Sequence, residues 1–532
     1  MDVDKVNNSI GLFYGRKTVS SNSAEGDNIT FNRYCNAYEP EQHCLSIFAQ
    51  LLACRQVASG GGRCYKVDTE MFLDDTPKQA VLIKLCHIFC TVVVTLIAAA
   101  ISRIITQKMS SMLRCRHWLK FFIEFILITL PSVISVNIAN AYVEHFGCLA
   151  LVVFCAIICW KKCDQYVLDR EFEFGRRPQV FTLLRATISY LTVLCILAID
   201  FENFPKFFRK THRYGASLMD TGIGLFVFSM GIVSQRLQKP SHLNRLLLPV
   251  GCILTLGLLR TTVLALIDYR QDEREYGVHW NAFFTLGFTK LIGTFLSAVA
   301  RSDGQLLLLG LFVLGTHEIA LQSGLQLFVM DSNIPRDTFA TANREGLCSL
   351  PGFVALYIVS VYFGKHFQTR ETLTFSDLKK ILKSLIIGIC VTSFSVVLSV
   401  MTVGIARVTC NVGYVVWILN IAAGVSLLYI AVFDLALDTI WPSSPKMAGH
   451  SDRDGCCILS NHMHTRVPLI MEAVNYNGLT FFLVANLLTG AVNIYLKPEE
   501  RNDAESIFIL MVYMFLTTTA MFILYKFKLR IA

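Results

Sequence analysis

The sequence predicts an all-α polytopic integral membrane protein with about 13 transmembrane helices. Of its 532 residues, 54% are apolar and only 16% are charged, and the mean hydropathy is +0.51. About a quarter of the residues in an ordinary soluble domain are charged, so the composition excludes a typical cytosolic enzyme. A bilayer core about 30 Å thick needs about 20 helical residues to cross it, and apolar runs of roughly that length recur along the chain.

The expected spans follow one another from residue 81 to the C-terminus. Six of them are placed at 81–104, 121–142, 146–160, 180–200, 217–234 and 246–267. Seven more begin near Phe283, Gln305, Leu347, Leu382, Val412, Leu479 and Ile507. The third and eighth runs are marginal in length or polarity.

The spans divide the chain into two parts. Residues 1–80 are expected to form a lumenal N-terminal extension, and residues 81–532 a multi-span membrane domain with a cytoplasmic loop at about 438–472. Most of the 18 cysteines lie singly in apolar runs, where cysteine acts as a small hydrophobe. A Cys/His cluster in the loop lacks the paired spacing of a zinc site, so we expect no metal and no resident cofactor. This cluster consists of His450, Cys456, Cys457, His462 and His464.

Positive charge is distributed unequally between the two sets of connections. If the N-terminus lies outside, the cytoplasmic connections contain 25 Lys and Arg residues and the opposite connections contain 11. Since Lys and Arg are enriched on the cytoplasmic side of membrane proteins, we expect a lumenal N-terminus and a cytosolic C-terminus. The net charge of +9 then follows from topology, and no nucleic acid is expected as a partner.

One connection, from Asp200 to Tyr214, departs from this charge rule. It places four cations on the side that should contain few, namely Lys206, Arg209, Lys210 and Arg213. Binding of an anion would explain the excess. An amphipathic Phe/Lys segment lying on the lipid headgroups, or the exceptions to the charge rule that short loops sometimes show, would explain it equally well. The composition leaves these explanations open.

Ionisable residues also lie within or at the ends of the expected spans, where they are costly and usually face a partner or a cavity. Asp220 and Arg260 are both expected near the outer ends of their spans. They could form a structural ion pair with each other or bind a ligand. For Lys290, Glu318 and Asp434 we expect structural pairing.

Three further outer segments, 275–281, 343–346 and 407–411, share a polar and aromatic composition. Together with Asp220 and Arg260, their side chains are the expected substrate-binding residues, and the segments contribute His279, Trp280, Asn281, Asn343, Arg344, Arg407 and Asn411. Trp280 would also suit the membrane interface, and His279 a capping or hydrogen-bonding role. All these segments fall on one face of the membrane, as a shared pocket would require.

At the same segments the sequence resembles the PIG-W family, the glucosaminyl-phosphatidylinositol inositol acyltransferases of GPI-anchor biosynthesis in the endoplasmic reticulum. The matching blocks extend in order from about the first span to the C-terminus. They include Ala198-Ile-Asp-Phe, Tyr214-Gly-Ala-Ser-Leu-Met-Asp-Thr-Gly222, Glu275-Tyr-Gly-Val-His-Trp-Asn281, Asn343-Arg-Glu-Gly346, Ser349-Leu-Pro-Gly352 and Leu483-Val-Ala-Asn486-Leu-Leu-Thr-Gly-Ala-Val-Asn493.

The resemblance implies an O-acyltransferase that moves a fatty acyl group, typically palmitoyl, from acyl-CoA to the inositol hydroxyl of glucosaminyl-phosphatidylinositol. Acyl-CoA is then a co-substrate and the glycolipid the acceptor. By position, Asp200 and Lys210 correspond to the family's catalytic pair. The second basic residue that the family usually has directly after Pro205 is displaced here to Arg209. The alternative function is a secondary transporter or flippase for an anionic solute or lipid, although transporters usually contain inverted repeats and the two halves of this chain show no self-similarity.

Overall fold

The computed structural model describes residues 78–113, 116–137, 178–234, 241–266, 272–367, 372–437 and 467–531, and the short pieces 142–143, 145, 147–148, 151–152 and 172–173. Three expectations therefore lie wholly or mostly outside the described residues. They concern the N-terminal extension, the third span, and the loop at 438–472 with its Cys/His cluster.

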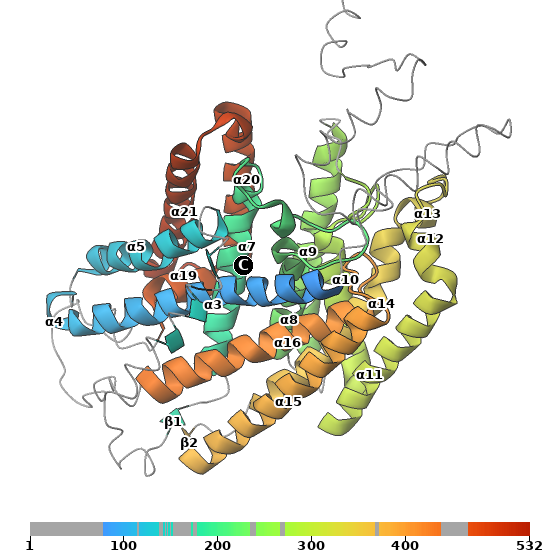
Figure 1. The fold of residues 1–532 in the computed structure, drawn as a ribbon, viewed down its shortest axis with the longest axis horizontal. Coiled ribbons are helices and arrows are strands. Elements are labelled where there is room, and N and C mark those ends of the chain that lie inside the picture. The colour runs from blue at the N-terminus through green and yellow to red at the C-terminus, as the bar shows by residue number, and fades with distance from the viewer. Residues whose placement is uncertain are drawn as a thin grey trace, which may run out of the picture. The chain divides into compact units, whose positions relative to one another are not determined.

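The described chain is helical apart from one pair of two-residue strands (Figure 1). Strands β1 (Phe172–Glu173) and β2 (Thr372–Leu373) pair antiparallel, with Phe172 opposite Leu373. The helices in the first half are α3 (Lys78–Lys108), α4 (Ser110–Leu113), α5 (His117–Val136), α7 (Gln179–Ala198), η5 (Lys206–Phe208), α8 (Leu218–Ile232) and α9 (Ser241–Leu266). Those that follow are α10 (Ala282–Val299), α11 (Asp303–Ala320), η6 (Leu321–Leu325), α12 (Gln326–Met330), α13 (Phe339–Ala342), α14 (Arg344–Phe367), α15 (Phe375–Met401), α16 (Val412–Tyr429), η7 (Ile430–Leu437), α19 (Leu469–Tyr476), α20 (Gly478–Leu496), η8 (Pro498–Glu500) and α21 (Asp503–Lys526).

The helices confirm the predicted fold class. Among the described residues, 11 helices are long and apolar enough to cross a membrane, and α8 is a shorter apolar helix. Each corresponds to one of the thirteen expected runs, and the third run is the one without a described helix. The sequence did not predict α19, an eight-residue helix that is too short for the period-based search. The eighth run is longer than expected, because α11 continues through the π-helix η6 into α12.

Polar residues fix the starting points of several spans. The side chains of Ser217, Asn281 and Asn411 accept hydrogen bonds from backbone N–H groups in the first turns of α8, α10 and α16, respectively. Such caps satisfy donors that the helix itself leaves unpaired. All three lie in segments singled out from the sequence, so these segments hold helix ends in place.

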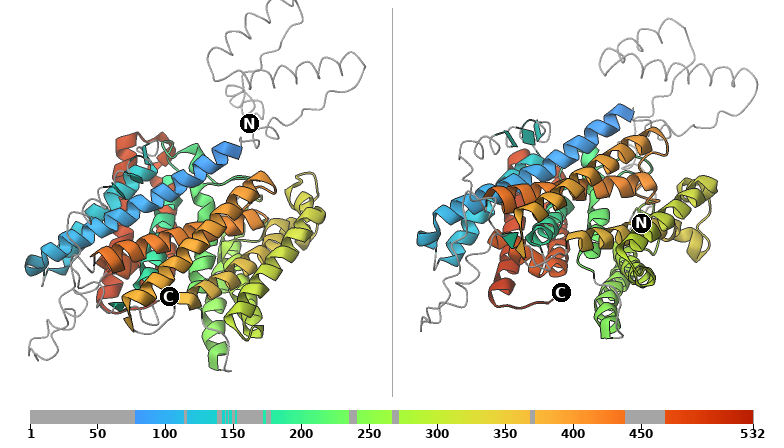
Figure 2. Two further views of the ribbon diagram at one scale, coloured as in Figure 1. Left: turned by 60° about the horizontal axis from the view of Figure 1, so that its bottom comes forward. Right: turned by 90° about the horizontal axis from the view of Figure 1, so that it is seen from below.

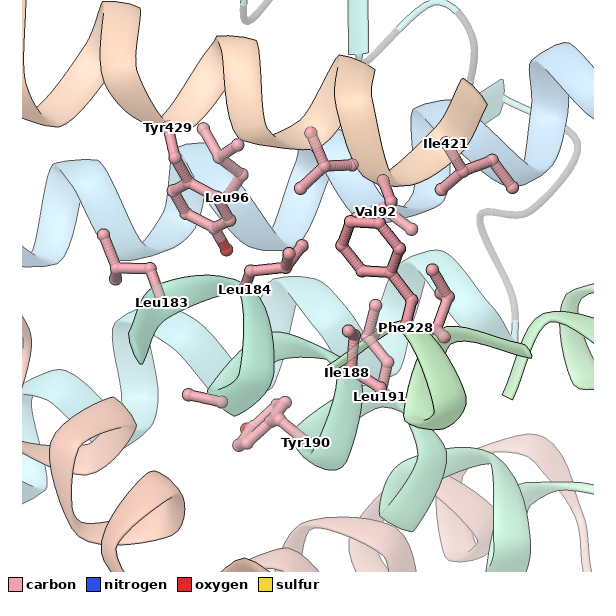
Figure 3. Close-up of a cluster of buried hydrophobic side chains, with 14 of the residues drawn as sticks. Val92, Leu96, Leu183, Leu184, Ile188, Tyr190, Leu191, Phe228, Ile421 and Tyr429 are labelled. Carbon is pink, nitrogen blue, oxygen red and sulfur yellow. The ribbon is translucent and has the colours of Figure 1, made fainter. Parts of the chain in front are cut away.

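Helix α7 lies at the centre of the bundle. Of the residues in its most apolar 18-residue stretch, 78% are buried. Figure 3 shows its side chains Leu184 and Ile188 packed with Val92 of α3, Phe228 of α8 and Ile421 of α16. Helices α3, α15 and α16 lie side by side in all views (Figures 1 and 2). By contrast, only 11% of the corresponding residues of α20 are buried, as expected for a helix at the lipid boundary. The rigid centre positions the loops at the ends of α7 and α8.

Helix α8 has only 15 residues, which correspond to about 22 Å, whereas the hydrocarbon core is about 30 Å thick. A helix of this length leaves part of that thickness to the non-helical residues at its ends. Non-helical backbone is tolerated at that depth where protein covers it. The segment 200–217 meets this condition, because Phe201, Phe204 and Phe208 are each at most 1% exposed.

Candidate functional site

The segment that broke the charge rule is anchored inside the protein. Phe201, Phe204 and Phe208 point into the hydrophobic core, while Lys206 and Arg209 are exposed. This arrangement contradicts the explanation in which the Phe side chains lie on lipid headgroups, because buried rings are not available to the bilayer. The anchored backbone instead presents Lys210 to the neighbouring loop.

One ion pair and one histidine–carboxylate contact connect this segment to the loop 272–281 that precedes α10. The Nζ atom of Lys210 lies 2.9 Å from Oε1 and 2.8 Å from Oε2 of Glu275. Two residues further on, Nδ1 of His212 lies 3.4 Å from Oδ2 of Asp272. The first pair is the more buried, with side-chain exposures of 35% for Lys210 and 25% for Glu275.

Of the two alternatives left open for Asp220 and Arg260, the structure does not contain the ion pair between them. Asp220, in the first turn of α8, pairs with Arg407, whose Nε donates to Asp220 Oδ1 at 2.9 Å. Both side chains are buried, with 0% of Asp220 and 4% of Arg407 exposed. Arg260 lies on the exposed surface of α9. Helices α8 and α16 are neighbours, so the loop that leads into α16 brings Arg407 to Asp220.

The Asp220 carboxylate also organises the Lys210 loop. Its Oδ2 accepts hydrogen bonds from Thr211 Oγ1 and Ser217 Oγ, each at 2.8 Å, and from the Thr211 backbone N–H at 3.2 Å. Thr211 directly follows Lys210. The buried ion pair therefore fixes the backbone beside the candidate catalytic lysine.

Tyr276 lies next to the buried Arg407 side chain. The guanidinium carbon of Arg407 lies 5.6 Å from the centre of the Tyr276 ring, a distance suited to a cation–π contact. Burial raises the pKa of Tyr276 to about 12, so its phenol stays protonated at neutral pH and can donate a hydrogen bond. Arg260 lies within electrostatic reach of the same ring. Three loops and α9 thus bring Lys210, Glu275, Tyr276, Arg260 and Arg407 into one region.

The loop 272–281 is held rigidly against the start of α14. The Oδ1 of Asn343 accepts hydrogen bonds from the backbone N–H groups of His279 at 2.8 Å and Trp280 at 2.9 Å. Gly277 has a φ of +111°, and a Cβ there would lie 2.5 Å from the Cα of Asn343. Glycine is needed at this position both for its backbone conformation and for the close approach.

Most of the remaining candidate residues stabilise the helix ends and turns around the site. The Trp280 ring is 7% exposed and its Nε1 donates to Thr285, whereas the His279 side chain is exposed. Asn281 and Asn411 cap α10 and α16. Arg344 donates to the backbone carbonyls of Asp331 and Ile334, which folds the turn before α13.

Asp200 lies two residues beyond the end of α7 and contacts α20. The Nδ2 of Asn493 donates to Asp200 Oδ2 at 2.9 Å. Burial raises the pKa of Asp200 above its usual value of 3.8, while the hydrogen bond from Asn493 lowers it. Within the described part of the chain, Asp200 and Lys210 make no hydrogen bond to each other. Each has its own partner, Asn493 or Glu275.

The three residues expected to form structural pairs, Lys290, Glu318 and Asp434, differ in what surrounds their side chains. Glu318 accepts from the backbone N–H of Val412 at 2.9 Å and from Gln322, so it caps α16 without forming an ion pair there. Lys290 of α10 lies near Arg185 of α7, a like charge, and Asp434 is buried in η7. The expectation of a paired Lys290 is thus not met by a carboxylate among the described residues.

Sequence reasoning missed Glu275 and Asn493 as partners of the candidate catalytic residues. Both lie in blocks that carry the family resemblance, Glu275 in the loop before α10 and Asn493 in the last part of α20. Their contacts join residues 65 and 293 positions apart in the chain. Spacing along the sequence cannot identify such partners.

The chain matches one protein family and is similar to several known proteins. The GWT1 family model matches residues 80–524. The chain is 31% identical over 352 residues to GPI-anchored wall transfer protein 1 of Schizosaccharomyces pombe, covering 65% of this chain and 72% of that protein. It is 30% identical over 411 residues to an uncharacterised protein of Arabidopsis thaliana, covering 75% and 86%. GPI-anchored wall transfer protein 1 of Candida albicans is 29% identical over 385 residues, covering 65% and 74%.

Proposed function

Because the chain belongs to the GWT1 family, we propose that it acts in GPI biosynthesis as an acyl-CoA-dependent acyltransferase. The acceptor is the inositol hydroxyl of glucosaminyl-phosphatidylinositol, and the acyl group is palmitoyl. The observation that supports this most strongly is the anchored segment 200–217. It places a half-buried carboxylate at one end, Asp200, and an ammonium held by Glu275 at the other, Lys210.

Acyl transfer to a sugar hydroxyl needs a base, because an un-ionised hydroxyl is a weak nucleophile. Asp200 supplies it. Asn493 occupies Oδ2, which leaves Oδ1 to accept the inositol proton as the hydroxyl oxygen attacks the thioester carbon. The tetrahedral intermediate then breaks its C–S bond, and the departing CoA sulfur takes up the proton from Asp200. Ester and free CoA thiol are the products, and the carboxylate is regenerated.

Lys210 stabilises the negative charge that forms on the thioester oxygen. One such donor in a preorganised site is worth about 3 kcal/mol of transition-state stabilisation. The separate partners of Asp200 and Lys210 suit this division of roles, because the base acts on the hydroxyl and the ammonium acts on the carbonyl oxygen. The two side chains need not touch each other.

The phosphate of the glycolipid requires a cation. Arg260 is the proposed first contact, because it is exposed and lies near Tyr276. Arg407 is engaged by Asp220 through Nε and contributes its remaining guanidinium N–H groups. Asp220, His279, Trp280, Asn281, Asn343, Arg344 and Asn411 are proposed to contribute to substrate binding mainly by shaping the loops around these cations.

We also propose the endoplasmic reticulum membrane as the location, with the N-terminus lumenal and the C-terminus cytosolic. The charge asymmetry of the connections supports this orientation. In this arrangement the segment 200–217 enters the membrane from the lumenal side. The acyl chain must then reach Asp200 from the cytosolic side, through the bundle or along its lipid-exposed surface.

The direct test is incubation of purified protein with radiolabelled palmitoyl-CoA and a glucosaminyl-phosphatidylinositol analogue. The expected product is the acylated glycolipid together with one equivalent of CoA thiol. A Lys210→Ala variant should form far less of it, and the exposed neighbour Lys206→Ala serves as the control. Release of free palmitate without acylated lipid from the wild-type protein would overturn the proposed function.

A further inference from the structure

We infer that Glu275 is a positioning residue that holds the Lys210 ammonium at the thioester oxygen. This inference rests on the proposed acyl transfer and adds a second residue to its machinery. Glu275 lies 65 residues further along the chain, on a different loop. It contacts the ammonium through both carboxylate oxygens, at 2.9 and 2.8 Å.

Glu275 is the fixed partner of this pair. Its loop is attached to α13 and α14 by two backbone hydrogen bonds, since Gly346 of α14 donates to the Tyr276 carbonyl at 3.0 Å and Val278 donates to the carbonyl of Ala342 in α13 at 2.9 Å. The neighbouring Gly277 packs directly against Asn343. The carboxylate therefore has a defined position, set by the start of a buried helix.

Lys210 is the flexible partner. A lysine side chain has four rotatable bonds and a compact ammonium that can take many positions. Its backbone is fixed on one side, because Thr211 is bound to Asp220 through two hydrogen bonds to Oδ2. With the backbone held by Asp220 and the ammonium held by Glu275, the side chain is restrained at both ends.

The geometry leaves one ammonium donor for the reaction. A lysine ammonium has three N–H donors, and Glu275 occupies two of them. The third can point to the oxygen on which charge develops. A donor held in place before the reaction stabilises that charge without reorganising at the moment of transfer.

Stability alone does not account for this pair. Its side chains are 35% and 25% exposed, and partly exposed ion pairs contribute little to stability. The same two loops are joined by a second contact, between His212 Nδ1 and Asp272 Oδ2 at 3.4 Å, so the loop contact does not depend on Glu275 alone. Asp272 therefore provides a matched control.

The test compares Glu275→Gln with Asp272→Asn in the acyl-transfer assay, using full-length protein of verified abundance. Glu275→Gln keeps the size of the side chain but removes the charge that attracts the ammonium. We expect kcat to fall at least tenfold while KM for the glycolipid changes less than threefold. Asp272→Asn removes the carboxylate charge from the second contact between the same loops and should retain kcat within twofold.

A charge exchange separates positioning from simple loop attachment. The double variant Lys210→Glu/Glu275→Lys restores an ion pair between the loops, so it should recover the thermal midpoint of the wild-type protein but not its kcat. Recovery of kcat in this variant would overturn the inference, as would unchanged kcat in Glu275→Gln. In both cases a deficient Lys210→Ala leaves the proposed function intact, whereas a fully active Lys210→Ala refutes the role of Lys210 itself.

Discussion

Arg407 donates its Nε hydrogen to Asp220 Oδ1 at 2.9 Å across 187 residues of sequence. The pair is almost completely buried, and its carboxylate also holds Thr211 and Ser217. A buried carboxylate that loses its counter-charge is strongly destabilising. This contact thus connects the start of α8, the loop before α16 and the backbone next to Lys210.

Removal of Arg407 is expected to destabilise the protein. Arg407→Met leaves the Asp220 carboxylate buried without its partner, which typically costs about 3–5 kcal/mol. We expect a lower thermal unfolding midpoint in detergent, measured by intrinsic fluorescence. The double variant Asp220→Asn/Arg407→Met removes both charges and should regain part of that loss. Equal midpoints for the single and double variants would argue against a coupled pair.

Arg260 should affect substrate affinity rather than folding, because it is exposed and is not the partner of Asp220. Arg260→Ala should raise the apparent KM for the glycolipid more than it lowers kcat, as expected for a contact made equally in the ground and transition states. Initial rates at varied glycolipid concentration measure both constants, with Lys206→Ala as the control. An unchanged KM would remove Arg260 from the binding site.

Asn493 should tune the pH dependence of the reaction. Its hydrogen bond lowers the pKa of Asp200, which burial raises, so Asn493→Ala should raise that pKa further. A base must be ionised, and activity is lost as the pH falls through its pKa. We therefore expect the acidic limb of the pH profile of kcat/KM to move to higher pH in Asn493→Ala.

The control for this shift is Asn486→Ala. Asn486 lies on the same helix, but its Nδ2 donates to the carbonyl of Phe482 within α20. Its removal should leave the pH profile in place. Coincident profiles for Asn493→Ala and the wild-type protein would show that Asp200 is not the titrating base.

The membrane orientation can be tested independently of activity. The charge asymmetry of the loops predicts that Asn28 is lumenal and that the tail after Lys526 is cytosolic. A tag after residue 532 should be digested by protease added to sealed microsomes. Asn28-Ile29-Thr30 is an N-glycosylation sequon, and it should be accessible to glycosylation. Protection of the C-terminal tag would contradict this orientation.

Much of the fold could be predicted because a membrane-spanning helix corresponds to one continuous apolar run in the sequence. The apolar runs that begin near Phe283, Leu347 and Val412 became α10, α14 and α16. The caps at Ser217, Asn281 and Asn411 were not predicted, because Asn281 and Asn411 were interpreted as substrate-binding residues. A helix of eight residues such as α19 has too few turns to show a period, and it was missed.

The partners inside the site could not be predicted in the same way. Arg260 and Arg407 are both cations that the sequence predicts near the ends of spans, and the sequence does not state which helix lies beside α8. The choice of Arg407 follows from the packing of α8 against α16. Similarly, Asn493 reaches Asp200 because α20 packs on α7.

The central claim, that Asp200 is the base for acylation, is tested most directly by the turnover of Asp200→Asn. The asparagine keeps the size of the side chain, and its amide oxygen can still accept the hydrogen bond from Asn493. Protein abundance should therefore be normal. Loss of the base should lower turnover with labelled palmitoyl-CoA and the glycolipid by about 10² or more. Acyl transfer near the wild-type rate at normal abundance would contradict the claim.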